Sequence, residues 1–197
     1  NKDTLRFYFI FNGPEVKDIS CSIEEMITVH NKFLVGTLGN FINRNFSFIN
    51  KKFEGIITEG KVDSKIKETT LNTYKEVGEL IEKGELKSAL SKVMDYISLG
   101  NKYYDENTPW IKVKENIEEF NDITYTCTYM IVNIANLIRP FLSETSDKIL
   151  NMLDISKESN WQEKEITGNI KIVNNELLFN RIDDEETKSI MDKLNNK

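Results

Sequence analysis

The most apolar stretch of the chain, Thr128–Ile138, constrains the fold more than any other feature. It lies in a helical segment that runs from about Asn116 to Arg139 and is apolar on almost every side from Tyr129 onward. A helix that is apolar all round has to be covered by other elements all round. The stretch is interrupted by asparagines and is much shorter than the ~20 residues that span a bilayer. It therefore predicts the central helix of a bundle and argues against a membrane protein.

Further segments show helical periodicity or helix-boundary signals. They are predicted to form the helices that cover the central one. Ser22 followed by Glu25 is a capping box that opens a helix extending to about Gly55, with a possible break near Gly36 and Gly39. Ser64 is a candidate N-cap and Gly84 a stop for the next helix. Another starts at Leu86 and ends before Pro109, and a short one follows Pro140, from Ser143 to about Leu153. The predicted fold class is all-α, a bundle of about five helices.

The two ends of the chain differ from this pattern. Residues 4–11 (TLRFYFIF) are β-rich and aromatic and precede the turn signal Asn12-Gly13-Pro14, so they are predicted to be the last strand of a domain lying upstream. The start at Asn1 fits a piece of a longer protein. Residues 154–197 read as an irregular tail with short alternating stretches, IKIV and ELLF, and an acidic helical end from Asp184.

Charge is distributed unevenly along the chain. The net charge of −6 argues at first against a nucleic-acid partner. However, residues 1–114 carry 17 basic and 16 acidic side chains, whereas residues 115–197 carry 9 and 16. A polyanion is therefore expected to meet the first part of the chain and to avoid the tail.

The sequence offers no pattern for catalysis or for a metal. The single His30 and the widely separated Cys21 and Cys127 cannot supply a four-ligand zinc site. No glycine-rich phosphate loop or nucleophile motif occurs. The cysteines are expected to be reduced thiols of a cytoplasmic protein.

A polar helix face is the first candidate for binding. At 100° per residue the large apolar side chains of residues 33–53 fall on one stripe, Leu34, Leu38, Phe41, Ile42, Phe48, Ile49 and Phe53. Asn40, Arg44, Ser47 and Lys51 fall opposite, while Asn45 sits inside the stripe and should be buried with a hydrogen-bond partner. Asn40 and Arg44 are spaced i, i+4 and can present hydrogen-bonding forks to base edges. The alternative is an ordinary solvated face.

Trp110, after Pro109 in a predicted loop, is the second candidate. Single-stranded RNA is commonly recognised by stacking its bases on such aromatic side chains. The alternative is a tryptophan that anchors the loop in the core.

Several segments, in order along the chain, resemble the anticodon-binding domain of methionyl-tRNA synthetases. FLVGTLGNFINRNFSFINKKFEG (33–55) resembles the first long helix of that domain, and GNKYYDENTPWIKVK (100–114) resembles the more specific A-N-K-Y-x-D-x-x-x-P-W segment. FLSETSDKIL (141–150) and ELLFNRID (176–183) are similar to two later motifs, with Ser143 and Asn180 in place of prolines. The opening LRFYFIFNGPE (5–15) resembles the strand and turn that close the family's catalytic half.

The resemblance implies roles for particular residues. Trp110, with Pro109, would take the wobble cytosine of the CAU anticodon of methionine tRNA, and Asn40 and Arg44 would contact the anticodon bases. Lys51, on the same face, would contact phosphate at most. Residues 1–20 would be a remnant of the catalytic half, residues 21–153 the anticodon-binding domain, and residues 154–197 a tail packing toward the catalytic side.

The resemblance also implies a parent enzyme, a cytoplasmic methionine–tRNA ligase that uses ATP with magnesium. Its active-site motifs are missing here, so this part alone is expected to be inactive, without a cofactor, and to bind tRNA and the catalytic half in cis, but neither DNA nor a membrane. Two alternatives remain. One is a helical protein-interaction module without an RNA ligand, and the other is the anticodon domain of a related class I synthetase.

Overall fold

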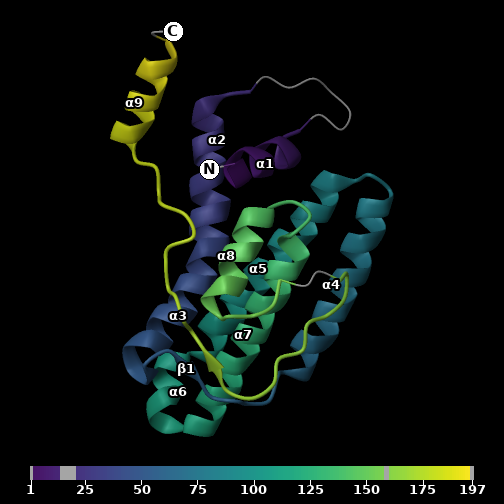
Figure 1. Cartoon of the computed structure of the whole chain (residues 1–197), viewed down its shortest axis with the longest axis vertical. Coiled ribbons are helices and arrows are strands. Elements are labelled where there is room, and N and C mark those ends of the chain that lie inside the picture. Colours follow the sequence, from purple (N-terminus) through teal and green to yellow (C-terminus); the bar gives the residue numbers. More distant parts are fainter. Residues whose placement is uncertain (1, 14–20, 158–159, 196–197) are drawn as a thin grey trace.

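A computed structural model describes residues 2–13, 21–157 and 160–195 of the chain. Almost all regular structure in these ranges is helical, which confirms the predicted all-α class (Figure 1). The elements are α1 (Lys2–Phe11), α2 (Ile23–Val29), the π-helix η1 (His30–Gly39), α3 (Asn40–Phe53), β1 (Ile56–Ile57), α4 (Ser64–Glu82), α5 (Leu86–Asn107), α6 (Pro109–Glu115), α7 (Ile117–Ile138), α8 (Ser143–Met152), β2 (Ile170–Lys171) and α9 (Asp184–Asn195).

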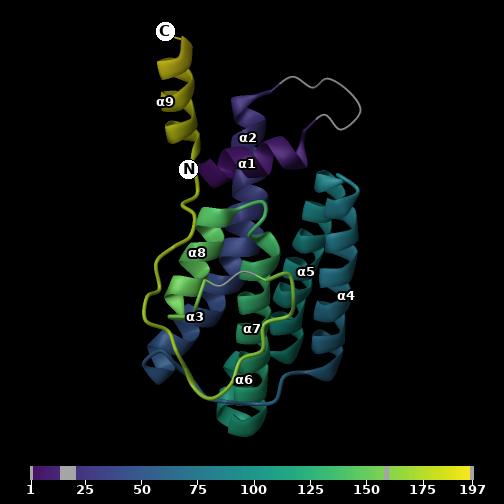
Figure 2. The ribbon, with the colours of Figure 1, turned by 45° about the vertical axis from the view of Figure 1, so that its right-hand side comes forward.

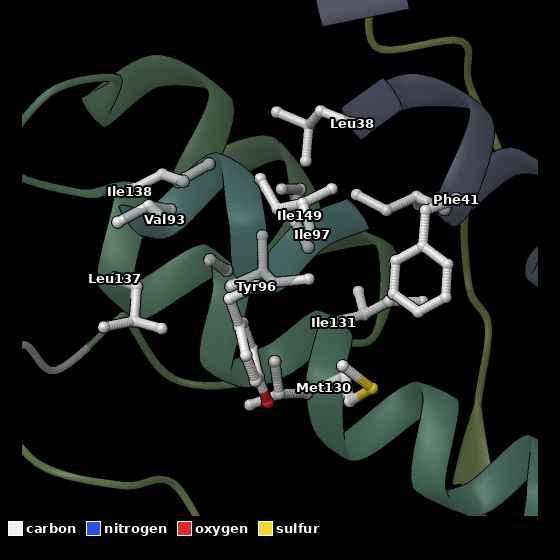
Figure 3. Packing of buried hydrophobic residues seen from close by; sticks show 14 of the residues in the cluster. Leu38, Phe41, Val93, Tyr96, Ile97, Met130, Ile131, Leu137, Ile138 and Ile149 are labelled. Carbon is white, nitrogen blue, oxygen red and sulfur yellow. The ribbon is translucent and has the colours of Figure 1, made fainter. Parts of the chain in front are cut away.

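Helix α7 is the centre of the bundle, as predicted. Every residue from Ile123 to Ile138 is buried, and α7 packs against α3, α4, α5, α6 and α8. Figure 3 shows side chains of η1, α3, α5 and α8 converging on Ile131 and its neighbours. Thr124 and Thr128 are tolerated in this core because their hydroxyls donate to carbonyls of the preceding turn; Thr128, for example, donates to the Thr124 carbonyl at 2.8 Å. The Thr126 hydroxyl instead accepts from the Asp63 amide at 3.0 Å. Among the described residues, no helix is long and apolar enough to cross a membrane.

The first long helix is one continuous run of α2, η1 and α3. Ser22 caps its start by accepting a hydrogen bond from the Glu25 amide at 3.3 Å, as the capping box predicts. The break expected near Gly36 and Gly39 is instead a π-helical segment. Asn45 is buried as predicted, and its amide donates to the Phe41 carbonyl at 2.9 Å.

Helices α4 and α5 form an antiparallel hairpin. Its first N-cap is Asp63 rather than the expected Ser64, because the Asp63 carboxylate accepts from the amides of Lys65 and Ile66. Gly84 ends the first helix at a φ of 78°, which a glycine adopts without strain, as predicted.

The predicted N-terminal strand is wrong, because residues 2–11 form helix α1. Of the aromatic residues that suggested a strand, Phe7, Tyr8 and Phe11 lie on the side of the helix that packs against the bundle, whereas Phe9 is 53% exposed. Phe7 and Phe11 stack with ring centroids 5.3 Å apart, and the Tyr8 hydroxyl donates to Glu25 at 2.8 Å. The buried Asp3 accepts from both the amide and the hydroxyl of Thr145 at 2.7 Å. Tertiary packing thus overrides a modest β propensity. The turn residue Pro14 lies outside the described residues.

The tail after α8 runs back along the bundle to α9, which contacts α2 and projects beyond it (Figures 1 and 2). Strand β2, within the IKIV stretch, pairs antiparallel with β1, Ile57 opposite Ile170. The ELLF stretch is not a strand, although Leu178 and Phe179 are buried. The helical end expected from Asp184 is confirmed as α9.

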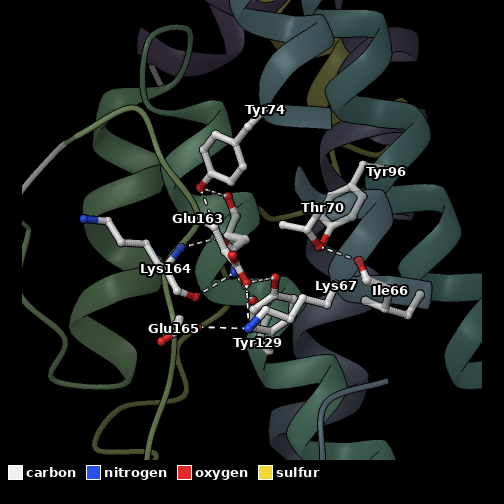
Figure 4. A network of polar contacts seen from close by, with 10 residues as sticks. Ile66, Lys67, Thr70, Tyr74, Tyr96, Tyr129, Glu163, Lys164 and Glu165 are labelled. Atoms are coloured by element: carbon white, nitrogen blue, oxygen red, sulfur yellow. Dashed lines mark hydrogen bonds and ion pairs between the residues drawn. The ribbon is translucent and has the colours of Figure 1, made fainter. Parts of the chain in front are cut away.

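Asparagines of the central helix hold the tail. The Asn133 side chain forms two hydrogen bonds with the backbone of Lys164. It donates to the carbonyl at 3.0 Å and accepts from the amide at 2.8 Å. Asn136 donates to the carbonyls of Asn160 and Gln162, both at 3.0 Å. Beside them, Tyr129 donates to Glu163 at 2.6 Å (Figure 4). The asparagines that interrupt the apolar run are therefore the attachment points of the tail.

Candidate nucleic-acid interface

The predicted binding residues lie where α3, α5 and α6 meet. Asn40 donates to Asn101 of α5 at 3.0 Å, and Arg44 forms an ion pair with Asp105 of α5 at 2.5 Å. From the first pair to the second, the residue number rises by four on both helices. Helices α3 and α5 therefore run in the same direction along this seam. They approach closely because Gly100 leaves room for the Phe41 ring; a Cβ at Gly100 would lie 2.7 Å from it.

The orientation of the Asn40 amide is determined by Asn101. The Asn101 amide donates to the carbonyls of Thr37 at 3.0 Å and Ile97 at 3.3 Å, which uses both of its N–H groups. Its oxygen therefore faces Asn40 and has to accept a hydrogen bond. Asn40 is exposed, and its bond to Asn101 uses one of its two amide N–H groups. The second N–H can donate to a ligand, and the amide oxygen can accept from one. This is the pattern that an asparagine offers to a base edge.

The Arg44 guanidinium is held on two sides. The hydrogen bond from Arg44 lowers the pKa of the Asp105 carboxyl, and the same bond raises the pKa of Arg44. The guanidinium carbon also lies 4.7 Å from the centre of the Tyr104 ring, a cation–π contact. Because a guanidinium has five N–H donors, several stay available to a ligand.

Trp110 is not in a loop, contrary to the prediction, but at the second position of helix α6. Thr108 adopts a left-handed conformation, φ 44°, between α5 and α6, and Pro109 begins the new helix, where its missing N–H costs no bond. Pro109 is buried, whereas Trp110 is 39% exposed. The Trp110 ring lies against the buried Tyr104, with centroids 5.7 Å apart. Trp110 thus has one supported face and an accessible surface.

Lys51 is exposed on α3, two turns beyond Arg44. Between them, Ser47 is occupied, since its hydroxyl donates to Asn43 at 2.9 Å and accepts from the tail residue Asn175 at 3.3 Å. The structure therefore brings Asn40, Arg44 and Trp110 together around α5 and leaves Lys51 at the edge of this surface.

The described residues contain no group of His, Cys, Asp and Glu side chains that could hold a metal ion. Cys127 is fully buried, and burial raises the pKa of its thiol, while Cys21 is exposed. His30 has a structural role: its Nε2 lies 2.9 Å from the Asn180 carbonyl, so it carries the proton, and its Nδ1 lies 3.0 Å from the Thr4 hydroxyl.

Residues 56–197 match the family model described as the anticodon binding domain of methionyl tRNA ligase, and residues 1–46 match the model of class I tRNA synthetases (M). The chain belongs to the methionyl-tRNA ligase family. This confirms the resemblance found in the sequence, and the fold is that of the helical anticodon-binding domain of these synthetases.

Curated methionine–tRNA ligases are similar over nearly the whole chain. Methionine–tRNA ligase 1 of Alkaliphilus oremlandii is 39% identical over 93% of the chain and 34% of its own length. The methionine–tRNA ligase of Bacillus cereus (strain G9842) is 36% identical over 98% of the chain and 35% of its own length. The chain thus spans about a third of the length of these ligases.

Solved structures share the fold. The Mycobacterium tuberculosis methionyl-tRNA synthetase in complex with methionyl-adenylate has a TM-score of 0.77 and 23% identity, over 91% of this chain and 37% of that one. The apo form of the same synthetase has a TM-score of 0.73 and 22% identity, over 84% of this chain and 38% of that one.

Sequence reasoning missed the α5 side of this candidate surface. Asn101, Tyr104 and Asp105 lie in the same segment as Trp110, and the four-residue spacing of Asn101 and Asp105 matches that of Asn40 and Arg44. The matching spacing was the available signal. It does not by itself show that the two helices lie side by side.

Proposed function

We propose that this surface binds the CAU anticodon of methionine tRNA. In this proposal, the exposed face of Trp110 stacks on the wobble cytosine, supported by Pro109, and Asn40 and Arg44 hydrogen-bond base edges of the same loop. The observation that carries the proposal is that the accessible Trp110 and the Arg44 guanidinium both contact one buried ring, Tyr104. Asn40 bonds to Asn101, about one turn earlier on the same helix. Splayed bases of a loop require both stacking and edge contacts.

The distribution of charge along the sequence supports a nucleic-acid ligand for the surface formed by α3, α5 and α6. The surface is built from residues 40–110, within the part of the chain that is not net acidic, while the acidic surplus lies after residue 114. Lys51, exposed at the edge of this surface, would contact phosphate and not a base.

In this proposal, the chain is the recognition half of an enzyme that charges methionine tRNA in the cytoplasm using ATP with magnesium. The catalytic half would form methionyl-adenylate, the ligand in one similar synthetase structure, and the present part alone would not react. The match of residues 1–46 to the class I synthetase model supports assigning residues 1–20 to the catalytic side.

The docking face toward the catalytic half would be the one formed by α1, α2 and the tail. A cavity of about 550 Å³ opens there between Leu5, His30 and Leu177. Leu5 and Leu177 are 46% and 63% exposed, an arrangement that a covering domain would complete.

The test of the reading surface is a titration of the wild type and of Trp110→Ala, Arg44→Ala and Lys51→Ala with two anticodon stem-loops that differ only at the wobble base, at fixed salt. Stacking contributes roughly 1–3 kcal/mol per base, so Trp110→Ala should weaken binding of the CAU loop about tenfold to a hundredfold. Arg44→Ala should also weaken it. Replacing the wobble cytosine should cost on the order of 1–3 kcal/mol through lost edge contacts.

Lys51→Ala is the matched control on the same helix, and it should weaken both loops equally because phosphate carries no sequence information. A wild type that does not distinguish the loops, or a folded Trp110→Ala variant that binds normally, would show that the reading site lies elsewhere.

A further inference from the structure

Tyr104 lies between the two kinds of reading residue. Its ring is 4% exposed, so it cannot itself stack on a base. It contacts the Arg44 guanidinium carbon at 4.7 Å and the Trp110 ring at 5.7 Å with a tilt of 45°. In the family segment that resembles residues 100–110, this position is not one of the specified residues.

We propose that Tyr104 is a positioning residue that fixes Arg44 and Trp110 relative to each other, so that edge and stacking contacts engage one anticodon loop together. This rests on the proposed function. Arg44 and Trp110 come from different helices, α3 and α6, and no described interaction joins them directly. Their mutual placement therefore depends on the α5 side chain between them.

Asp105 alone cannot fix the guanidinium. It meets one nitrogen of Arg44 and is itself 56% exposed, so the guanidinium plane could rotate about that bond. The Tyr104 ring removes this freedom because a guanidinium lies preferentially over an aromatic face. The same ring supports one side of Trp110, where a tilted aromatic pair is favourable.

The ring and not the hydroxyl of Tyr104 performs this role. Among the described residues, the hydroxyl has no hydrogen-bond partner. Burial raises the pKa of Tyr104 to about 12, so the ring stays neutral under physiological conditions. Phenylalanine should therefore substitute for Tyr104, whereas leucine, of similar apolarity but without an aromatic face, should not.

The experiment compares Tyr104→Phe and Tyr104→Leu in a Trp161→Phe background, in which Trp110 is the sole tryptophan. In the RNA-free protein, Tyr104→Leu should lower the fluorescence anisotropy of Trp110 and increase its quenching by acrylamide, and Tyr104→Phe should change neither. Thermal unfolding identifies any variant that has lost its fold. If Tyr104→Leu has lost it, the test uses Tyr104→Met instead, because the flexible methionine side chain adapts to irregular space in a core without offering an aromatic face.

Binding is then measured with the two stem-loops. Tyr104→Leu should weaken the CAU loop about tenfold, through the lost cation–π and ring–ring contacts. It should weaken the loop with the changed wobble base less, so that discrimination falls. In an Arg44→Ala, Trp110→Ala background the further loss should vanish, because Tyr104 acts only through those two residues.

The outcomes separate the two proposals. If the wild type does not distinguish the loops, the proposed function fails, and the RNA-free fluorescence still tests the positioning. If the wild type discriminates but folded Tyr104→Leu keeps full affinity and an unchanged Trp110 signal, the positioning role is overturned and the function stands. An equal loss for both loops would show a structural role only.

Discussion

At the scale of single residues, the ion pair between Arg44 and Asp105 should be visible in a titration. The hydrogen bond from Arg44 lowers the pKa of the Asp105 carboxyl below its ordinary value of 3.8. A lowered carboxyl pKa stabilises the fold above the ordinary value, and this contribution is lost as the pH falls through the lowered one. Asp105 is 56% exposed, so the effect on stability is small and the titration itself is the better measurement.

In Arg44→Ala, the titration midpoint of Asp105, followed by the NMR shift of its carboxyl carbon, should rise toward 3.8. Lys51→Ala, which changes a charge two turns away on the same helix, should leave that midpoint where it is. An unchanged midpoint in Arg44→Ala would mean that the pair does not persist in solution.

Sequence reasoning predicted one side of this site and not the other. Asn40 and Arg44 could be identified because an i, i+4 spacing puts two side chains on one face within a single helix. Tyr104 and Asp105 could not, because their importance depends on the parallel seam between α3 and α5. That seam is a tertiary contact, permitted by the missing side chain at Gly100.

At the scale of elements, the sequence predicted the long helices and the short helix α8, but it missed α1 and α6. The central helix and the α4–α5 hairpin have enough turns for the helical period to be read. Helices α1 and α6 have 10 and 7 residues, and their formation depends on contacts made elsewhere. Asp3 bonds to Thr145, 142 residues away, and the Trp110 ring rests on the preceding helix. Local propensity contains neither contact.

The attachment of the tail to the central helix gives an element-scale prediction. Asn133 is fully buried and exchanges two hydrogen bonds with the Lys164 backbone. Asn133→Ala would leave those two backbone groups without their partner and would remove one hydrogen bond of the Tyr74 hydroxyl, which should cost about 2–4 kcal/mol of unfolding free energy. Denaturant unfolding measures this cost, and hydrogen exchange should find the Lys164 amide exposed.

Asn175→Ala is the matched control in the same tail, because Asn175 is exposed and donates one 3.3 Å bond to Ser47. It should change the unfolding free energy by less than about 0.5 kcal/mol. If Asn133→Ala were equally mild, the buried asparagines would not be what holds the tail.

At the scale of the whole molecule, the N-terminal helix α1 and the C-terminal tail meet at one place. The His30 ring contacts α1 through Thr4 and the tail through the carbonyl of Asn180. This junction lies on the cavity wall together with Leu5 and Leu177. It is the end of the bundle opposite α6, which carries Trp110 (Figure 2). The fold therefore separates the proposed anticodon surface from the proposed docking face.

The docking face should become protected when the rest of the ligase is present. The chain spans about a third of the length of its relatives, so a full-length protein offers the comparison. Hydrogen exchange of residues 4–10 and 176–180 should slow in the full-length protein relative to this chain alone, because a covered backbone opens less often. Leu5→Glu in the full-length protein should restore fast exchange by placing a charge in the covered face. Leu71→Glu is the control, since Leu71 is 49% exposed on α4, a helix that does not line the cavity. If residues 4–10 and 176–180 exchanged equally in both proteins, the catalytic half would have to dock on another surface, and the exposed Leu5 and Leu177 would need a different partner.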